Sequence, residues 1–369
     1  MSCIELIGIS GLELDPHQHN LLASCSFLVV SRRHLSLIDG YSQPVIPITP
    51  IKEMVEKVQQ ALMQGSVAVL ASGDPLFYGI GRNLLSSFPH ALIRIHPALS
   101  AVQLACARFK IPWDDLTLTS LHGRDKKEII SAILRQPKTM LFTDGTNSPD
   151  IIAQRLMTTL EAVEDQDRLA AITVRVAENL ALPEERISEG TVHEIARSSF
   201  SPLNMMLIEQ PKPQENGCFG LSEPDICHSR GLITKDEVRA VNLHKLCLPT
   251  RGVFWDIGGG SGSISLEAAR MNPELSVYTI EKKPEEQDNI KNNIKKYAAF
   301  NMHLVKGEAP EALALLPSPD RVFIGGSGGR MSSIIDHVNT RLLPGGRVVV
   351  NAVLAKNTRS SLSCRSRTR

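Results

Sequence analysis

The sequence predicts an α/β protein of two domains, each built on a mainly parallel β-sheet. With 369 residues the chain is long for one domain and comfortable for two. Short β-rich apolar runs alternate with helical stretches over almost its whole length. This alternation stops at Glu209–Ser229, a stretch with three prolines and two glycines, and then resumes. We therefore expect a linker there and a domain on either side of it.

In the first half, the apolar runs and helical stretches follow each other closely. Strands are expected at Ile4–Ile9, Phe27–Val30, Val67–Ala71, Leu92–Ile95, Leu116–Ser120, Thr139–Thr143, Ala170–Val174 and Leu203–Ile208, and helices at Pro16–Cys25 and Ile51–Met63. The second half starts a new series. Its strands are expected at Val253–Asp256, Val277–Glu281, His303–Val305, Arg321–Ile324 and Arg347–Val350, with helices between them.

The composition favours a small-molecule partner. Hydrophobic residues make up 42% and charged residues 21%, as in ordinary soluble proteins. The 40 basic and 39 acidic residues leave a net charge of +1, whereas nucleic-acid-binding proteins usually carry a basic excess. The seven cysteines are odd in number and lack zinc-site spacing, so we expect reduced thiols, no metal site and a cytoplasmic location. No apolar run is long enough to cross a bilayer.

A glycine-rich turn in the second half carries the strongest functional signal. It follows a strand, opens a helix at Ser263–Arg270, and consists of Asp256, Ile257, Gly258, Gly259, Gly260, Ser261 and Gly262. Glycines let a ligand approach the backbone, and a helix N-terminus offers unpaired N–H groups. The alternative is a turn that only packs a helix on a sheet. An acid at Asp256 would repel a pyrophosphate and attract an ammonium group, which favours S-adenosylmethionine over a dinucleotide.

Two further segments of the chain fit the same cofactor. Glu281 ends the next strand, where an acid accepts hydrogen bonds from ribose hydroxyls. Its alternative role is a solvated acid before a lysine-rich helix. After the third strand, Gly307, Glu308 and Ala309 occupy the place where adenine-contacting residues lie in such folds.

Residues 230–353 resemble a known family. The motifs are GLITKDEVRA from Gly231, FIGGSGG from Phe323, LPGGR from Leu343, and Asn351-Ala352. Together they are similar to the C15-methylating, decarboxylating methyltransferase domain of cobalamin synthesis, which has a Rossmann-like class I fold. The resemblance implies that Thr234, Gly258 to Gly262, Glu281 and Ala309 line the cofactor site. It also implies that the IGGSGG loop, with Ser327, faces the methyl group and the substrate.

Residues 3–210 resemble a second family. The motifs are ASGDPLFYG from Ala71, HPALSA from His96, Pro112-Trp113, SLHGR from Ser120, and SPLN from Ser201. Their order is that of the tetrapyrrole methyltransferases, whose two α/β lobes hold S-adenosylmethionine between them, and SLHGR is similar to the C5-methylating members. The resemblance implies cofactor contacts from Gly8, Gly73, Asp74 and the motif around Ser100. Two departures are the opening turn Gly8-Ile9-Ser10-Gly11, which has fewer glycines and no proline, and Ala98, where glycine is usual. By local chemistry alone, Asp74 is expected to cap the helix that follows.

Catalytic residues are not identified, but several candidates stand out. His122 is a possible general base or a hydrogen-bonded structural residue. Arg124 is a candidate for binding substrate carboxylates in a forked geometry. Arg32, Arg33 and Arg330 are candidates of the same kind, and each could equally be a solvated surface residue.

Joined in this order, the two halves resemble the fused enzymes that methylate a precorrin ring at C5 and C15 and decarboxylate its C12 acetate. We expect residues 1–210 to form the tetrapyrrole methylase domain, 211–229 the linker and 230–353 the second methyltransferase domain. The alternatives are an RNA methyltransferase, or an enzyme in which only the first domain is active. The resemblance also implies a homo-oligomer.

The C-terminus departs from the second family's pattern. That domain normally continues past the Asn351-Ala352 motif with two final strands, whereas residues 354–369 are rich in serine and arginine and lack acids. We expect a disordered tail and a shortened sheet whose last strand, Arg347–Val350, has an unpaired edge. This hypothesis predicts poor solubility or edge pairing between chains.

Overall fold

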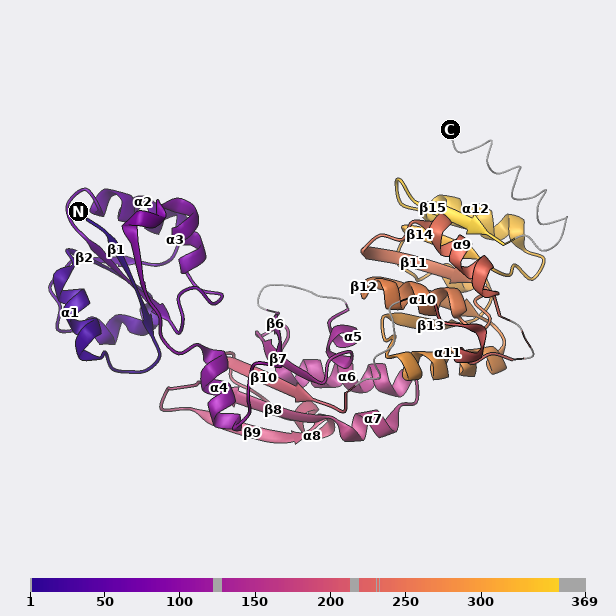
Figure 1. Cartoon of the computed structure of the whole chain (residues 1–369), viewed down its shortest axis with the longest axis horizontal. Helices are drawn as coiled ribbons and strands as arrows, with labels where there is room; N and C mark the ends of the chain where they lie inside the picture. The colour runs from indigo at the N-terminus through magenta and orange to yellow at the C-terminus, as the bar shows by residue number, and fades with distance from the viewer. Residues whose placement is uncertain (1, 122–127, 213–218, 230, 232, 352–369) are drawn as a thin grey trace.

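The computed structural model describes residues 2–121, 128–212, 219–229, 231 and 233–351. Figure 1 shows three α/β bodies, one for each five-stranded sheet, with the second body between the other two. We call them the first lobe, the second lobe and the C-terminal domain. The predicted α/β architecture, with two lobes followed by a separate C-terminal α/β domain, is confirmed.

The first lobe is built on an all-parallel sheet. Its strands lie in the order β3 (Val45–Pro47), β2 (Phe27–Val30), β4 (Val67–Ser72), β1 (Ile4–Ile9), β5 (Ile93–His96). The helices are α1 (Pro16–Ser24), α2 (Ile51–Ala61) and α3 (Gly81–Ser87). Every residue of β1 is buried, as expected for a central parallel strand covered on both faces. The carboxyl ends of β1, β2 and β4 thus meet at one edge.

The second lobe departs from the expected parallel sheet. Its strand order is β6 (Thr117–Ser120), β7 (Lys138–Phe142), β10 (Asn204–Glu209), β8 (Thr173–Glu178), β9 (Arg186–Thr191), and only β6 and β7 pair in parallel. Its helices are α4 (Ala101–Phe109), α5 (Ile129–Leu134), α6 (Pro149–Ala162), α7 (Gln166–Ala171) and α8 (Val192–Ala196). The strand expected at Ala170–Val174 is wrong in its start, because α7 continues through Ala171.

The C-terminal domain again has an all-parallel sheet, in the order β13 (Met302–Lys306), β12 (Glu274–Glu281), β11 (Arg251–Ile257), β14 (Arg321–Ile324), β15 (Arg347–Val350). Its helices are α9 (Asp236–Leu246), α10 (Ser263–Met271), α11 (Pro284–Tyr297) and α12 (Met331–Arg341). All five predicted strands are present, and β15 is the edge strand of the described sheet. The tail, residues 354–369, lies outside the described residues.

The linker is partly attached to the C-terminal domain. The backbone N–H groups of Gly220 and Leu221 donate to the buried carboxylate of Glu267 on α10. The backbone of Cys227 exchanges two hydrogen bonds with the Asn293 side chain on α11. In the described part of the chain, no helix is long and apolar enough to cross a membrane.

Candidate functional site

The first candidate site is a cavity of about 640 Å³ at the carboxyl edge of the C-terminal sheet. It lies where the strand order reverses around β11, which is the usual place for a ligand in an open parallel sheet. Of the predicted cofactor residues, Thr234, Gly258, Gly259, Gly260, Ser261, Glu281, Gly307, Glu308 and Ala309 line this cavity. Ser327, the candidate of the IGGSGG loop, lines it too. Most of the residues that the sequence predicts for the second domain's cofactor site thus line one cavity.

The glycine loop after β11 has a shape that only glycine allows at several positions. Gly258, Gly260 and Gly262 all have positive φ angles, between 55° and 74°. A Cβ on Gly258 would lie 2.4 Å from the carbonyl oxygen of Gly326 in the IGGSGG loop. Gly262 is the N-cap of α10, so the first N–H groups of this helix follow directly on the loop. The two glycine loops are packed backbone to backbone on one side of the cavity.

Glu281 links the glycine loop to the next strand. Its carboxylate accepts hydrogen bonds from the backbone N–H groups of Gly260 at 2.8 Å, Lys282 at 2.9 Å and Lys283 at 2.8 Å. A carboxylate has about four acceptor positions, so one remains for a ligand hydroxyl. The predicted ribose contact is compatible with this geometry, and the structure adds a second role, because Glu281 fixes the loop.

Asp256 lies elsewhere than expected. It is 1% exposed beneath the glycine loop and does not line the cavity. Its Oδ2 accepts a hydrogen bond of 2.6 Å from Ser265, whose Oγ in turn accepts one from Thr279. Burial raises the pKa of Asp256 to about 6. The carboxylate is thus joined to α10 and, through Ser265, to β12, and its buried position does not favour direct attraction of an ammonium group in the cavity. Gly262 likewise does not line the cavity.

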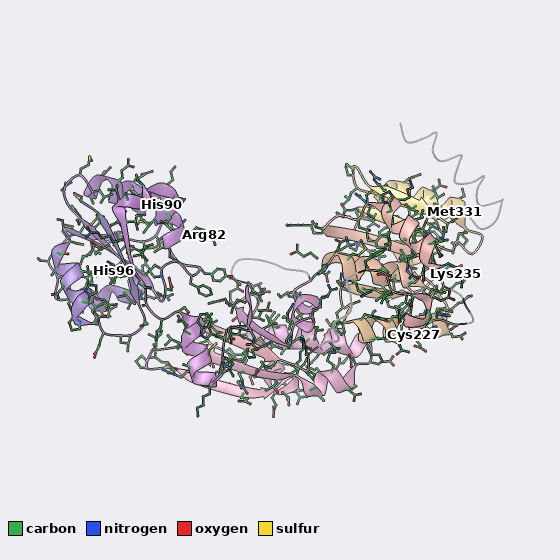
Figure 2. The ribbon with its side chains drawn as sticks, viewed as in Figure 1. Arg82, His90, His96, Cys227, Lys235 and Met331 are labelled. Carbon is green, nitrogen blue, oxygen red and sulfur yellow. The ribbon has the colours of Figure 1, made fainter. Side chains whose placement is uncertain are left out.

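Charged side chains surround the opening of this cavity. Lys282 pairs with Glu308 at 2.7 Å, and a Cβ on Gly328 would lie 2.7 Å from the same Glu308 oxygen. Lys235 pairs with Glu223, and Figure 2 shows it on the C-terminal domain. The sequence reasoning missed Lys235, Lys282, Lys283 and Glu286 as lining residues. Arg330 does not line the cavity, because its guanidinium forms a two-pronged pair with Glu311.

The second candidate site is a cavity of about 800 Å³ lined by both lobes. The first lobe contributes the ends of β1 and β4 and the residues after β2, and the second lobe contributes the ends of β6 and β7 and the start of β10. Of the predicted residues, Gly73, Asp74, Ser100 and Arg33 line it, whereas Gly8 and Arg32 do not. His122 and Arg124 lie outside the described residues.

Gly8 acts on this cavity through packing. A Cβ at Gly8 would lie 2.5 Å from the Gly73 carbonyl oxygen and 2.9 Å from the Ala98 Cβ. Three segments therefore meet at Gly8, and the methyl group of Ala98 fits because this position has no side chain. The Asp74 prediction is corrected in one respect: Asp74 accepts from the Leu76 N–H in a local turn, and α3 begins only at Gly81. Ser100, in contrast, caps α4 through a capping box with Gln103.

This second cavity combines an aromatic wall with cationic groups. The rings of Phe77, Tyr78 and Phe142 pack together with centroids 4.9 to 5.6 Å apart and join the two lobes. Arg33 and Arg82 also line the cavity, and Figure 2 shows Arg82 on the side of the first lobe nearer the rest of the chain. An apolar wall and guanidinium groups suit a large, flat ligand with carboxylate arms.

Two other lining groups were missed from the sequence. His34 is buried, and its Nε2 lies 3.3 Å from the Ser72 hydroxyl; burial and Arg33 lower its pKa, so the imidazole is neutral near pH 7. Thr143 donates to the Asn204 side chain across β7 and β10. His34 follows β2 and Thr143 follows β7, so both lie at carboxyl ends of strands. The sequence alone does not show that these two strand ends border the same cavity.

No cluster of three or more His, Cys, Asp or Glu residues that could hold a metal ion occurs among the residues that the structure describes.

Comparison with known proteins places the chain among enzymes of corrin chemistry. The family model for tetrapyrrole (corrin/porphyrin) methylases matches residues 18–196, and the model for the precorrin methyltransferase domain matches residues 225–368. A Sinorhizobium protein named precorrin-6Y C(5,15)-methyltransferase [decarboxylating] is 34% identical over 355 residues, which is 94% of this chain and 82% of the relative. A Mycobacterium tuberculosis protein of the same name is 28% identical over 95% of this chain and 87% of its own length.

Shorter relatives match only part of the chain. The cobalt-precorrin-6B C(15)-methyltransferase (decarboxylating) of Salmonella typhimurium is 39% identical over 131 residues, 36% of this chain and 67% of the relative. The crystal structure of a Geobacter metallireducens precorrin-6y C5,15-methyltransferase is 43% identical, covers 40% of this chain and 80% of its own, and has a TM-score of 0.40.

Proposed function

Since the chain belongs to the family of precorrin-6Y C(5,15)-methyltransferases (decarboxylating), we propose that it methylates a precorrin ring at C5 and C15 and decarboxylates the C12 acetate. The methyl donor is S-adenosylmethionine. The observation that carries the proposal is the presence of two separate cavities, each lined by residues of its own methyltransferase motifs. The RNA methyltransferase alternative has no support from the relatives, which are named as precorrin enzymes.

The C-terminal cavity fits the methyl donor. Its glycine loop would let a ligand approach the backbone closely, and Glu281 has acceptor capacity left for a ribose hydroxyl. When bound, S-adenosylmethionine supplies a methyl group on a positively charged sulfur. The IGGSGG loop, with Ser327, borders the same cavity and would orient the ring carbon toward that methyl group.

The cavity between the lobes fits the C5 reaction. Arg33 and Arg82 would bind carboxylate arms of the ring, and Phe77, Tyr78 and Phe142 would pack against its flat face. The turn of Gly73 and Asp74 and the capped residue Ser100 lie on the same cavity and would contact the methyl donor. The neutral His34 beside Ser72 would accept or donate a single hydrogen bond there.

The proposal also covers the domain limits and the oligomeric state. We propose domain limits at residues 210 and 230 and a homo-oligomer in solution. Light scattering of the purified protein tests the oligomer, and a monomeric mass would contradict it.

The test of the function is the mass of the product. The purified chain is incubated with S-adenosylmethionine and the reduced precorrin, and the product mass is measured. Two added methyl groups and one lost carbon dioxide are expected. One added methyl group with the acetate retained would favour the second candidate, in which only the N-terminal domain is active. An unchanged mass in a protein that binds S-adenosylhomocysteine would overturn the precorrin assignment.

A further inference from the structure

The second lobe and the C-terminal domain meet through a set of side-chain contacts. Figure 1 shows α5, α6 and α7 on the side of the second lobe that faces this domain. One hydrophobic cluster of buried residues continues from α5, α6 and α7 into α10 and α11. Polar contacts surround it: Glu128 accepts from the Ser276 hydroxyl at 2.5 Å, Glu164 pairs with Lys291, and the Arg168 guanidinium lies 5.2 Å from the centre of the Phe300 ring.

Arg135, which follows α5, makes the most specific of these contacts. Its Nη2 donates to the carbonyl oxygen of Ala269 at 2.9 Å and to the Asn301 side chain at 2.5 Å. Burial lowers its pKa to about 10, so the guanidinium keeps its charge at neutral pH. Asn301 is itself fully buried and donates to the carbonyl oxygens of Ala269, Asn272 and Leu275.

These contacts satisfy the C-terminal end of α10. The last carbonyl groups of a helix have no partner within the helix, and a cation there is favoured by the helix dipole. Arg135 therefore supplies, from the second lobe, a donor and a positive charge at this end of α10, beside the donor that Asn301 gives to the same carbonyl. The opposite end of α10 is Gly262, the last residue of the glycine loop. A helix of nine residues spans only about 13 Å.

We propose that Arg135 is a positioning residue for the C-terminal cofactor site, which it controls through α10 although it belongs to the N-terminal unit. α10 is buried along residues 263–269, so a shift at its C-terminal end must move the helix as a body. The glycine loop moves with it, and the loop is in backbone contact with the IGGSGG loop. The C15 site thus depends on the docking of the second lobe. This inference rests on the proposed function, since it takes the glycine loop as the cofactor site.

The experiment compares variants of the full chain. Arg135→Ala removes the contact, and Arg135→Lys keeps the charge and one donor. Glu164→Ala removes an exposed carboxylate of the same interface whose partner, Lys291, lies on α11 and keeps its pair with Asp288. Binding of S-adenosylhomocysteine is measured by calorimetry, and the KM for S-adenosylmethionine and the kcat are measured for each methylation, resolved by product mass.

For Arg135→Ala we expect the binding of S-adenosylhomocysteine at the C-terminal site to weaken about tenfold, with the other site unchanged. A change of this size is within the range seen for residues that couple distant sites. The KM of the C15 methylation should rise with little change in its kcat, and the C5 methylation should be unaffected. Arg135→Lys should fall between the parent and Arg135→Ala, and it carries the test if Arg135→Ala does not fold. Glu164→Ala should match the parent.

Two results would overturn the inference: unchanged binding at both sites in the Arg135 variants, or an equal loss in Glu164→Ala. A parent chain that binds no S-adenosylhomocysteine would instead overturn the proposed function, so the two failures are distinguishable.

Discussion

Single residues decide whether the C-terminal cavity can hold a ligand, and Gly258 is the clearest case. We expect Gly258→Ala to abolish C15 methylation and decarboxylation, because its Cβ would lie 2.4 Å from the Gly326 carbonyl oxygen at a φ of +69°. The product should carry one methyl group and retain its acetate, as measured by mass spectrometry.

The matched control for this variant is Gly345→Ala. Gly345 has a φ of +76° but no atom within 4 Å of its Cβ position, so it reports backbone strain alone. Strain of this kind costs on the order of 1 kcal/mol and should leave the product unchanged. A doubly methylated product from Gly258→Ala would show that the two loops can separate without loss of the reaction.

Asp256 gives a prediction about pH. Its pKa is raised from 3.8 to about 6 by burial, so between these values the folded state holds a proton that the unfolded state has lost. The contribution of Asp256 to stability therefore falls as the pH rises toward about 6 and is constant above about 7. The stability of the parent minus that of Asp256→Asn should decrease from pH 5 to 7 and then level off. Urea unfolding at a series of pH values measures this difference in stability. A difference that grows with pH would contradict a raised pKa of Asp256 in the folded state.

How far the sequence predicts the sites depends on how local each signal is. The sequence brings the glycine loop and Glu281 to one cavity because a strand, a turn and a helix follow each other directly in the chain. Asp256 does not line the cavity, and the sequence pattern gives no sign of this, because its buried position comes with hydrogen bonds that join it to Ser265 and, through Ser265, to Thr279. The wall of Phe77, Tyr78 and Phe142 could not be predicted, since it combines two lobes.

At the scale of elements, α10 is tied to the linker by a buried charged cluster. Glu267 on this helix is 1% exposed in its side chain, lies between Arg239 and Arg270, and accepts the Gly220 and Leu221 N–H groups. We expect Glu267→Ala to destabilise the protein by about 3 to 5 kcal/mol, because the two buried guanidinium groups lose a carboxylate partner and the Gly220 and Leu221 N–H groups lose their acceptor. Urea unfolding measures the loss.

An exposed pair of the same chemistry serves as the control. Glu274→Ala removes the partner of Arg251, whose side chain is 82% exposed, and should cost less than about 1 kcal/mol. Equal losses in the two variants would mean that the Glu267 cluster adds nothing to stability beyond an exposed ion pair.

The elements that the sequence did not predict depend on contacts between segments that are far apart in the chain. β9, with the sequence RISEGT, has no alternation of apolar residues, and its residues are exposed or half-buried. It forms because β8 offers a free edge, which is tertiary information. The boundary of α7 was misplaced because LAAITV is a continuous apolar run that suits a buried helix end and a buried strand equally. The antiparallel pairing of the second lobe was likewise hidden, since apolar runs do not encode strand direction.

At the scale of the whole molecule, two cavities predict two cofactor sites per chain. Calorimetric titration with S-adenosylhomocysteine should give a stoichiometry of two for the parent and one for Gly258→Ala, because that substitution affects only the C-terminal cavity. A stoichiometry of one for the parent would remove one of the two proposed sites.

The docking of the C-terminal domain on the second lobe has a mechanical consequence. The cavity between the lobes is lined by both of them, and the second lobe is packed against α10 and α11 of the C-terminal domain. The first lobe is joined to it by the chain between β5 and α4 and by the aromatic contacts of Phe77 and Tyr78 with Phe142. A movement that widens the cavity between the lobes would therefore displace the first lobe relative to the other two bodies, which are packed against each other.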